Sequence, residues 1–261
     1  MKTLLAGVLY PLTTVALVLF LWYLATDVYQ VPSYILPSID QVLEALKRGY
    51  VDGEYWEHLA FTLRAMVLGY LAGVAVAMIL GVLVAEIRVV ERMIFPVVIA
   101  LQSMPKVALA PLVIVWFGFG IESKIVLVAL ICFFPIFINV IAGLRSVDSN
   151  LVDMMRAFGA PAPRILFEVK LPHAAPTIFA GLQISVVLGL IGAVVGEFIA
   201  STRGLGFLIQ ASSNLLDLGV VFAALISLAA IGICGTQFVR LVQRRLIFWQ
   251  RSTDAVTSHE A

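Results

Sequence analysis

The sequence predicts an all-helical integral membrane protein with about six transmembrane helices. Two observations support this prediction. Of the 261 residues, 62% are hydrophobic and only 13% are charged, whereas a soluble domain usually has about 45–50% apolar and about 25% charged residues. The hydrophobic residues are also gathered into segments of spanning length. A soluble chain of this composition would have too little polar surface to cover its core, so the bilayer is the expected solvent.

Each expected span follows from the length of an apolar segment, because a transmembrane helix needs about 20 mostly apolar residues. The segments that meet this requirement are residues 4–25, 63–85, 93–117, 125–145, 174–198 and 219–239. The first is longer than the core of a signal peptide, which has about 7–15 residues, so we interpret it as a retained helix. The third contains Pro96, Pro105 and Pro111. Proline interrupts helical hydrogen bonding, so we expect this span to be kinked.

The distribution of basic residues predicts the orientation of the chain. An even number of spans places both termini on one side of the membrane. With that side inside, eleven of the 17 basic residues are cytoplasmic, five are external and Lys106 lies within a span. Cytoplasmic loops carry the excess of Lys and Arg, so both termini are expected in the cytoplasm. The whole chain, 1–261, then forms one transmembrane domain, with outer segments at about 27–61 and 199–218 and a cytoplasmic segment at about 146–173.

Charge and cysteine content argue against several other classes of protein. The net charge is +1, and no basic patch indicates a nucleic-acid partner. Cys132 and Cys234 lie inside apolar runs, without the CxxC or Cys/His spacing of a metal site, and we interpret both as small buried residues. We expect no metal and no cofactor on this chain.

The glycines of two spans predict close helix packing. Both Gly69-x-x-x-Gly73 and Gly192-x-x-x-Gly196 follow the spacing that lets neighbouring helices approach closely in a membrane. We expect these faces to pack within one subunit, with packing between subunits as the alternative.

The cytoplasmic segment has the pattern of two short helices separated by a glycine. Residues that can accept hydrogen bonds from a helix start come first: Asp148, Ser149 and Asn150. An apolar stripe with helical spacing follows: Leu151, Met154, Met155 and Phe158. Gly159 fits a left-handed helix end, and Pro161 prevents continuation. A second helical stretch, 164–170, leads into the fifth span. The stripe fits either docking on a partner protein, to which methionine adapts its shape, or contact with lipid headgroups.

A resemblance to a known family favours the first interpretation. Residues 153–159 (DMMRAFG) are followed, after nine residues, by 169–172 (VKLP). This spacing resembles the loop motif of binding-protein-dependent ABC importer permeases, which is Glu-Ala-Ala, three residues, Gly, nine residues, Ile, one residue and Leu. Here Asp153 replaces the glutamate, two methionines replace the alanines and Val169 replaces the isoleucine. The larger methionines suggest a docking surface shaped for a particular ATPase.

The resemblance covers most of the chain and is closest to the nitrate/sulfonate/taurine branch of that family. It is carried by 36–45 (LPSIDQVLEA), 100–118 (ALQSMPKVALAPLVIVWFG), 133–147 (FFPIFINVIAGLRSV) and 193–208 (AVVGEFIASTRGLGFL). It implies the architecture of a type I importer in the bacterial inner membrane. It also implies a permease that is not an enzyme, a second permease copy, for which a homodimer is favoured over a heterodimer, and an external solute-binding protein. The implied solute is small, for example nitrate, a sulfonate or taurine.

The resemblance assigns the cytoplasmic segment to ATPase docking and coupling. The implied positions are Asp153, Met154, Met155, Arg156, Ala157, Gly159, Leu171 and Pro172. The chain lacks the sequence G-x-x-x-x-G-K-[ST] of a phosphate-binding loop. ATP and magnesium are therefore expected on a separate ATPase dimer.

Polar residues within the spans are candidates for the translocation path. Lys106 lies midway along the third span, where a lone charge costs roughly 2.5–3.5 kcal/mol on insertion scales. It is either a cationic point on an anion path or a structural lysine that pairs with an acid or caps carbonyls freed by Pro105. Glu197 is either its partner or a gate residue. The remaining candidates, which fit helix–helix hydrogen bonds equally well, are Gln102, Ser103 and Asn139.

Two other classes of function are weighed against an importer permease. A secondary transporter usually shows inverted repeats, broken helices in matching halves and a midplane acid relay, and only one kinked span and one central lysine are found here. A membrane enzyme would need a catalytic motif, and the sequence contains neither HExxH nor GxSxG. The sequence of this subunit leaves the solute open, because the external binding protein largely selects it.

Overall fold

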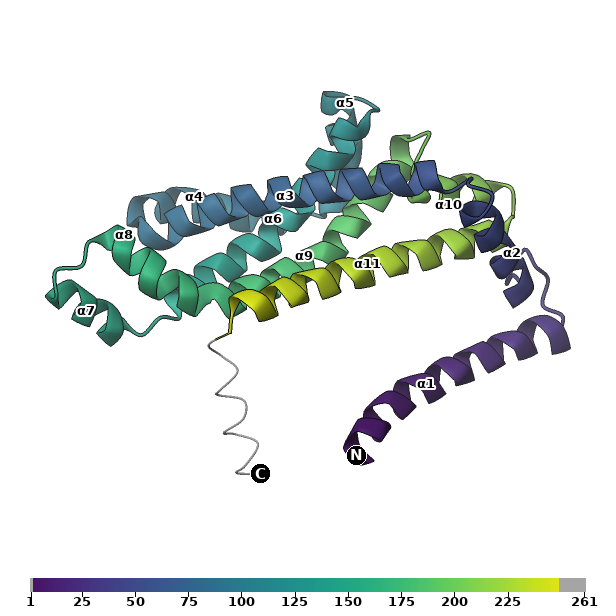
Figure 1. The fold of residues 1–261 in the computed structure, drawn as a ribbon. Coiled ribbons are helices and arrows are strands. Elements are labelled where there is room, and N and C mark those ends of the chain that lie inside the picture. The colour runs from purple at the N-terminus through teal and green to yellow at the C-terminus, as the bar shows by residue number, and fades with distance from the viewer. Residues whose placement is uncertain (1, 249–261) are drawn as a thin grey trace. The chain divides into compact units, whose positions relative to one another are not determined.

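The computed structural model describes residues 2–248, which form helices joined by turns and short loops, with no strand among them (Figure 1). Its α-helices are α1 (Lys2–Tyr23), α2 (Ile39–Tyr50), α3 (Trp56–Glu86), α4 (Arg88–Gln102), α5 (Ala110–Phe117), α6 (Ile121–Arg145), α7 (Ser149–Ala157), α8 (Ala162–Ile165), α9 (Leu171–Ala200), α10 (Leu205–Asn214) and α11 (Leu218–Leu246). Short 3₁₀ and π stretches, at Lys106–Leu109, Leu24–Val28 and Leu166–Lys170, join some of them.

The expected spans are helical, and their number is close to six. In the described part of the chain, four helices are long and apolar enough to cross a membrane: α3, α6, α8 joined to α9, and α11. The pair α4 and α5 adds a fifth if it is counted as one span. The first expected span corresponds to α1 and the π stretch that follows it, of which Leu12–Val28 falls among the shorter apolar helices.

The third span is broken rather than kinked. The helix Arg88–Gln102 and the helical segment Lys106–Phe117 meet at an angle of 93°. Pro96 is accommodated inside α4, and Pro111 lies in the first turn of α5, where the missing N–H removes no helical bond. Pro105 lies in the break, with extended backbone at φ −68° and ψ 100°. Of the three prolines, therefore, Pro105 marks the interruption.

The chain divides into two compact units. Unit 1 contains the residues up to Phe61 together with Thr202–Ala229, and unit 2 contains Thr62–Ser201 together with the residues from Ala230 onwards. In unit 1, α2 begins with a capping box, in which Ser38 Oγ accepts from the Gln41 N–H at 3.3 Å and Gln41 Oε1 accepts from the Ser38 N–H at 3.1 Å. Its buried Ala45 packs in a cluster with Tyr55 and Ala223.

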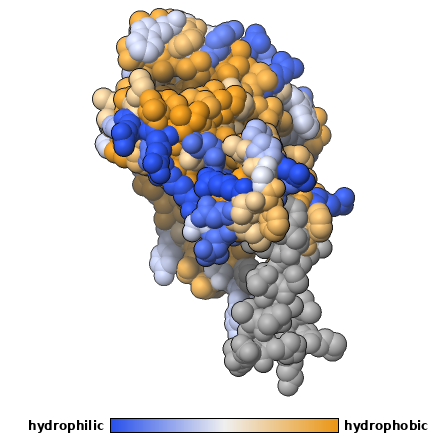
Figure 2. Space-filling view, turned by 90° about the vertical axis from the view of Figure 1, so that its left-hand side faces the viewer, coloured by the Kyte–Doolittle hydropathy of each residue, from blue (hydrophilic) through white to orange (hydrophobic). Residues whose placement is uncertain are grey.

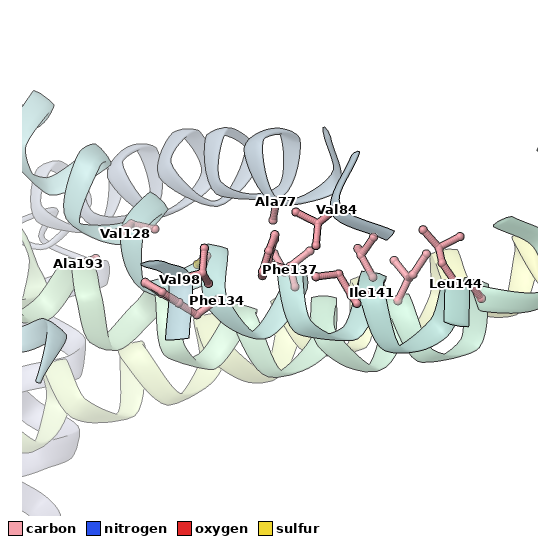
Figure 3. Packing of buried hydrophobic residues seen from close by; sticks show 14 residues of the cluster. Ala77, Val84, Val98, Val128, Phe134, Phe137, Ile141, Leu144 and Ala193 are labelled. Atoms are coloured by element: carbon pink, nitrogen blue, oxygen red, sulfur yellow. The ribbon is translucent and has the colours of Figure 1, made fainter. Parts of the chain in front are cut away.

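The core of unit 2 lies along one face of α6. Phe134, Phe137 and Ile141 are spaced by three and four residues, so they share that face. They lie in the same buried cluster as Ala77 and other residues of α3, α4 and α9 (Figure 3). Because α6 contributes most of the large side chains in this cluster, it acts as the central helix of unit 2.

The glycine motifs pack within the subunit, as the sequence predicted. A Cβ atom on Gly69 would lie 2.6 Å from the Ile125 carbonyl oxygen of α6, and one on Gly73 would lie 2.8 Å from the Ala129 oxygen. On α9, a Cβ on Gly192 would lie 3.0 Å from Ile131 Cδ1. These separations leave no room for a larger side chain, so the glycines fix α3 and α9 against α6.

Candidate functional site

Helix α7 is the first helix of the segment 146–173, which the sequence predicts to be cytoplasmic and which we call the cytoplasmic segment, and it has well-defined ends. At its start, the Asp148 carboxylate accepts a hydrogen bond from the Asn150 N–H at 2.9 Å. At its end, the Ala160 N–H donates to the Met155 carbonyl and the Gly159 N–H donates to the Arg156 carbonyl, which is the bonding of a Schellman motif. Gly159 has φ +77°. The sequence prediction of a left-handed glycine at this helix end is confirmed.

The apolar stripe on α7 lies at the surface. Phe158 is 82% exposed, Met154 47% and Leu151 38%, whereas Met155 is half-buried. Val152, which neighbours the half-buried Met155 on the helix, is buried. Figure 2 shows the side of the molecule on which α7 and α8 lie, where hydrophilic residues border a hydrophobic surface. We name the exposed side chains of residues 151–159 the α7 surface.

Among the described residues, the two charges of the α7 surface form an ion pair with each other. Asp153 and Arg156 form an exposed ion pair at 3.0 Å. Exposed pairs contribute roughly 0.2–1 kcal/mol to stability, so either side chain exchanges its partner at little cost. Ala157 is exposed beside them. The surface thus combines apolar area with two charges that are free to bind a partner protein.

The cytoplasmic segment is attached to the long helices through α9. Residues Ala162–Ala200 form one continuous helical run, with Pro172 in the first turn of α9, where a proline is tolerated, and with Leu171 half-buried beside it. Lys170 donates to Glu86, at the end of α3, at 2.7 Å. A displacement of this segment therefore reaches α9 directly and α3 through the ion pair.

The candidate path residues lie at the break of the third span and on α6. Gln102 ends α4, and the Ser103 hydroxyl donates to the Ile99 carbonyl at 3.1 Å; both residues are exposed. Lys106 Nζ lies 4.6 Å from the ring centroid of Phe134, a cation–π contact. The Asn139 amide donates to the Pro135 carbonyl within α6 at 2.7 Å.

Glu197 interacts with Thr62 and Lys124. Its carboxylate is fully buried and accepts a hydrogen bond from the Thr62 hydroxyl at 2.8 Å. It also interacts electrostatically with Lys124. The structure therefore supplies partners for Glu197 other than the one that the sequence suggested.

Lys124 is the residue that sequence reasoning missed. It is fully buried in the first turn of α6. Its ammonium group donates to the Phe119 carbonyl at 2.8 Å and to the Ala200 carbonyl. Two features of the sequence could have indicated this role: Lys124 comes directly before an apolar segment, and Glu197 lies inside another expected span. The pairing itself spans more than 70 residues and leaves no local pattern.

Comparison with known families decides the class of protein. Residues 59–248 match the family described as the binding-protein-dependent transport system inner membrane component. The match includes α7, the broken span and α9. The chain belongs to this family. It is the permease of an ABC importer, a multi-pass inner-membrane subunit and not an enzyme, so a secondary transporter and a membrane enzyme are both excluded.

The permease is similar to proteins with several different named solutes. It is 38% identical to the riboflavin transport system permease protein RibX of Chloroflexus aurantiacus, over 93% of this chain and 90% of that protein. It is 33% identical to the taurine transport system permease protein TauC of Escherichia coli, over 90% and 88%. It is 32% identical to the putative aliphatic sulfonates transport permease protein SsuC of Bacillus subtilis, over 94% and 88%. The predicted branch is therefore confirmed.

A solved structure shows the same fold. One chain of the inward-facing MetNI methionine ABC transporter superposes with a TM-score of 0.55 and 23% sequence identity, over 72% of this chain and 93% of that chain. The predicted architecture of an importer permease is confirmed by this similarity.

Proposed function

We propose that this permease conducts a small anionic solute and couples its movement to ATP hydrolysis by a separate ATPase dimer. The α7 surface is the observation that carries the coupling part of the proposal. It presents Met154 and Phe158 beside an ion pair that exchanges partners easily. A groove on a partner protein that accepts an amphipathic helix would bury such a surface. The similarity to a chain of the MetNI methionine ABC transporter supports an ATPase as that partner.

The break in the third span supports a path between two copies of the permease. Irregular backbone at membrane depth is tolerated only where it is buried in protein or lines a water-filled cavity. Residues 102–105 lie in or next to the break, and their side chains are exposed in the single chain. A second copy facing this break would enclose it. We therefore propose a homodimer around a central path lined by Gln102, Ser103 and Lys106. Asn139 of α6 lies against Gly181 of α9, and we propose it as a further candidate for this path.

Lys106 supports an anion as the solute. Its ammonium group is half-buried over the Phe134 ring, and a cation at low dielectric attracts anions strongly. The relatives named for taurine and for aliphatic sulfonates agree with this class. We propose that an external binding protein delivers the solute to the outer segments 37–60 and 200–217.

Replacing Lys106 with methionine is expected to lower anion uptake by about tenfold or more, because the side chain keeps its length and loses its charge. The permease would be reconstituted with its ATPase and binding protein, and uptake of taurine, nitrate and riboflavin would be measured. We expect the native permease to take up taurine or nitrate. We expect Lys106→Arg, which keeps the positive charge, to retain most of this uptake. Arg240→Met, which removes an exposed basic side chain of α11 outside the proposed path, the outer segments and the α7 surface, is the control. Uptake of riboflavin alone, or full uptake in Lys106→Met, would contradict the anion assignment.

A further inference from the structure

A buried charged cluster joins the outer ends of several helices in unit 2. Lys124 and Glu197 are each fully buried. The Lys124 ammonium group donates to the carbonyl of Phe119, in the turn between α5 and α6, and to the carbonyl of Ala200, at the end of α9. Glu197 interacts electrostatically with it and accepts a hydrogen bond from Thr62 of α3. The cluster therefore connects α3, the turn before α6, α6 itself and α9.

Apolar packing holds the first part of α5 against unit 2. Ala110, Val113 and Ile114 are buried, and Ala110 and Val113 lie in a cluster with Leu127 and Ile131 of α6. The last turn of α5 is different, because Val115 and Trp116 are exposed. At its start, α5 continues from the 3₁₀ stretch Lys106–Leu109, which follows the break at Pro105. At its end, Gly118 has φ +81°, and the chain reaches the Phe119 carbonyl one residue later. Lys124 thus holds the end of α5 that apolar packing leaves weakly attached.

The glycines of α9 leave room for this arrangement. A Cβ atom on Gly196 would lie 3.2 Å from Lys124 Cγ and 3.4 Å from Leu127 Cδ2. The lysine stem therefore runs closely past α9 on its way to the Ala200 carbonyl. Glu122, in the same turn of α6, adds a second acidic charge that interacts with the ammonium group.

Two buried charges are a costly way to join helices, because apolar residues of similar volume often give equal or greater stability. Directed hydrogen bonds fix the position of one helix relative to another. Apolar surfaces can slide over one another, whereas a hydrogen bond between an ammonium group and a carbonyl holds two points together. Ionisable residues within membrane segments accordingly point to a functional role. The position fixed here is that of α5 relative to α6 and α9.

We propose that Lys124 and Glu197 are positioning residues, which make α5 move as one body with α6 and α9 during the transport cycle. This inference rests on the proposed path, because α5 belongs to the helical segment Lys106–Phe117, which follows the break and begins with Lys106. When the ATPase drives α9 through the cytoplasmic segment, the cluster passes the movement to α5 and so to the path. Without it, α9 moves while α5 is left behind.

The test uses the double variant Lys124→Met/Glu197→Gln, because removing both charges together avoids leaving one buried and unpaired. The glutamine oxygen can still accept from Thr62. Val113 is 5% exposed against α6, so Val113→Cys, with Cys132 and Cys234 replaced by serine, reports the detachment of α5. The full chain with its ATPase would be placed in lipid nanodiscs, and the maleimide labelling rate would be measured in the resting state and after trapping with ATP and vanadate.

In the otherwise native chain we expect slow labelling, equal within twofold in the two states. In the double variant we expect labelling to rise at least about fivefold after trapping only. A rate that is unchanged in both states, or raised equally in both, would overturn the proposal, because the second result describes a purely structural contact. Ser185→Ala removes a different buried hydrogen bond between α9 and α6 and is the control, with no change expected.

If the double variant does not assemble, Thr62→Val carries the same test with a smaller rise of about twofold expected after trapping, and an unchanged rate again overturns the proposal. Failure of the underlying function is recognised separately. A native chain that recruits no ATPase would refute the proposed coupling. A Lys106→Met variant with native uptake would refute the proposed path. Neither result depends on the labelling of Val113→Cys.

Discussion

Replacing Gly159 with arginine is expected to weaken binding of the ATPase by at least about 30-fold. The residue has φ +77°, and no atom lies within 4 Å of the position of a Cβ atom, so the new side chain projects into the space that the partner must occupy. The left-handed backbone adds roughly 1–2 kcal/mol of conformational cost for a residue with a side chain. Binding would be measured by titrating purified ATPase onto the permease in nanodiscs.

Gly53→Arg is the matched control for this experiment. Gly53 also has a positive φ, of +100°, and open space around it, but it lies in the expected outer segment. It suffers the same backbone cost without adding a side chain to the α7 surface. Equal loss of ATPase binding in both variants would indicate a general effect of strain and would contradict the docking role of Gly159.

Replacing Phe158 with serine is expected to produce the second large loss of ATPase binding. Its ring is 82% exposed in the single chain, so its removal opens no cavity in the fold. An aromatic residue at the centre of a protein interface commonly contributes 2 kcal/mol or more, which corresponds to a factor of about 30 in Kd. The same titration would measure it, together with the melting temperature of the permease.

Phe119→Ser serves as the control, because Phe119 is 78% exposed in the turn between α5 and α6, away from the cytoplasmic segment in sequence. We expect it to leave the Kd of the ATPase unchanged. A Phe158→Ser variant that binds the ATPase with native affinity would favour the other interpretation of the stripe, contact with lipid headgroups.

The cytoplasmic segment was predictable because its signals are local. A helix start at Asp148, helical spacing of Leu151, Met154 and Phe158, and a glycine followed by Pro161 each depend on residues within one or two turns. The structure confirms the helix ends and the exposed stripe. The spacing of Gly69 and Gly73 predicted close packing against another helix, but it did not indicate which helix or which residues they contact.

The long-range polar contacts were not predictable. The ion pair between Lys170 and Glu86 joins residues 84 positions apart, and the bonds of Lys124 depend on how α9 ends beside α6. The broken span was foreseen only as a kink, because three prolines in one segment do not reveal which of them lies outside a helix. Pro105 does so because it falls between two helices, whereas Pro111 occupies a first turn.

The most direct test of the central claim is ATP hydrolysis by the reconstituted assembly of permease, ATPase and external binding protein. We expect hydrolysis to be faster with the loaded binding protein than with the empty one, and Gly159→Arg to abolish this stimulation while the membrane fold stays intact. A native permease that recruits no ATPase, or a Gly159→Arg variant that keeps full stimulation, would contradict the assignment of the α7 surface as the coupling element.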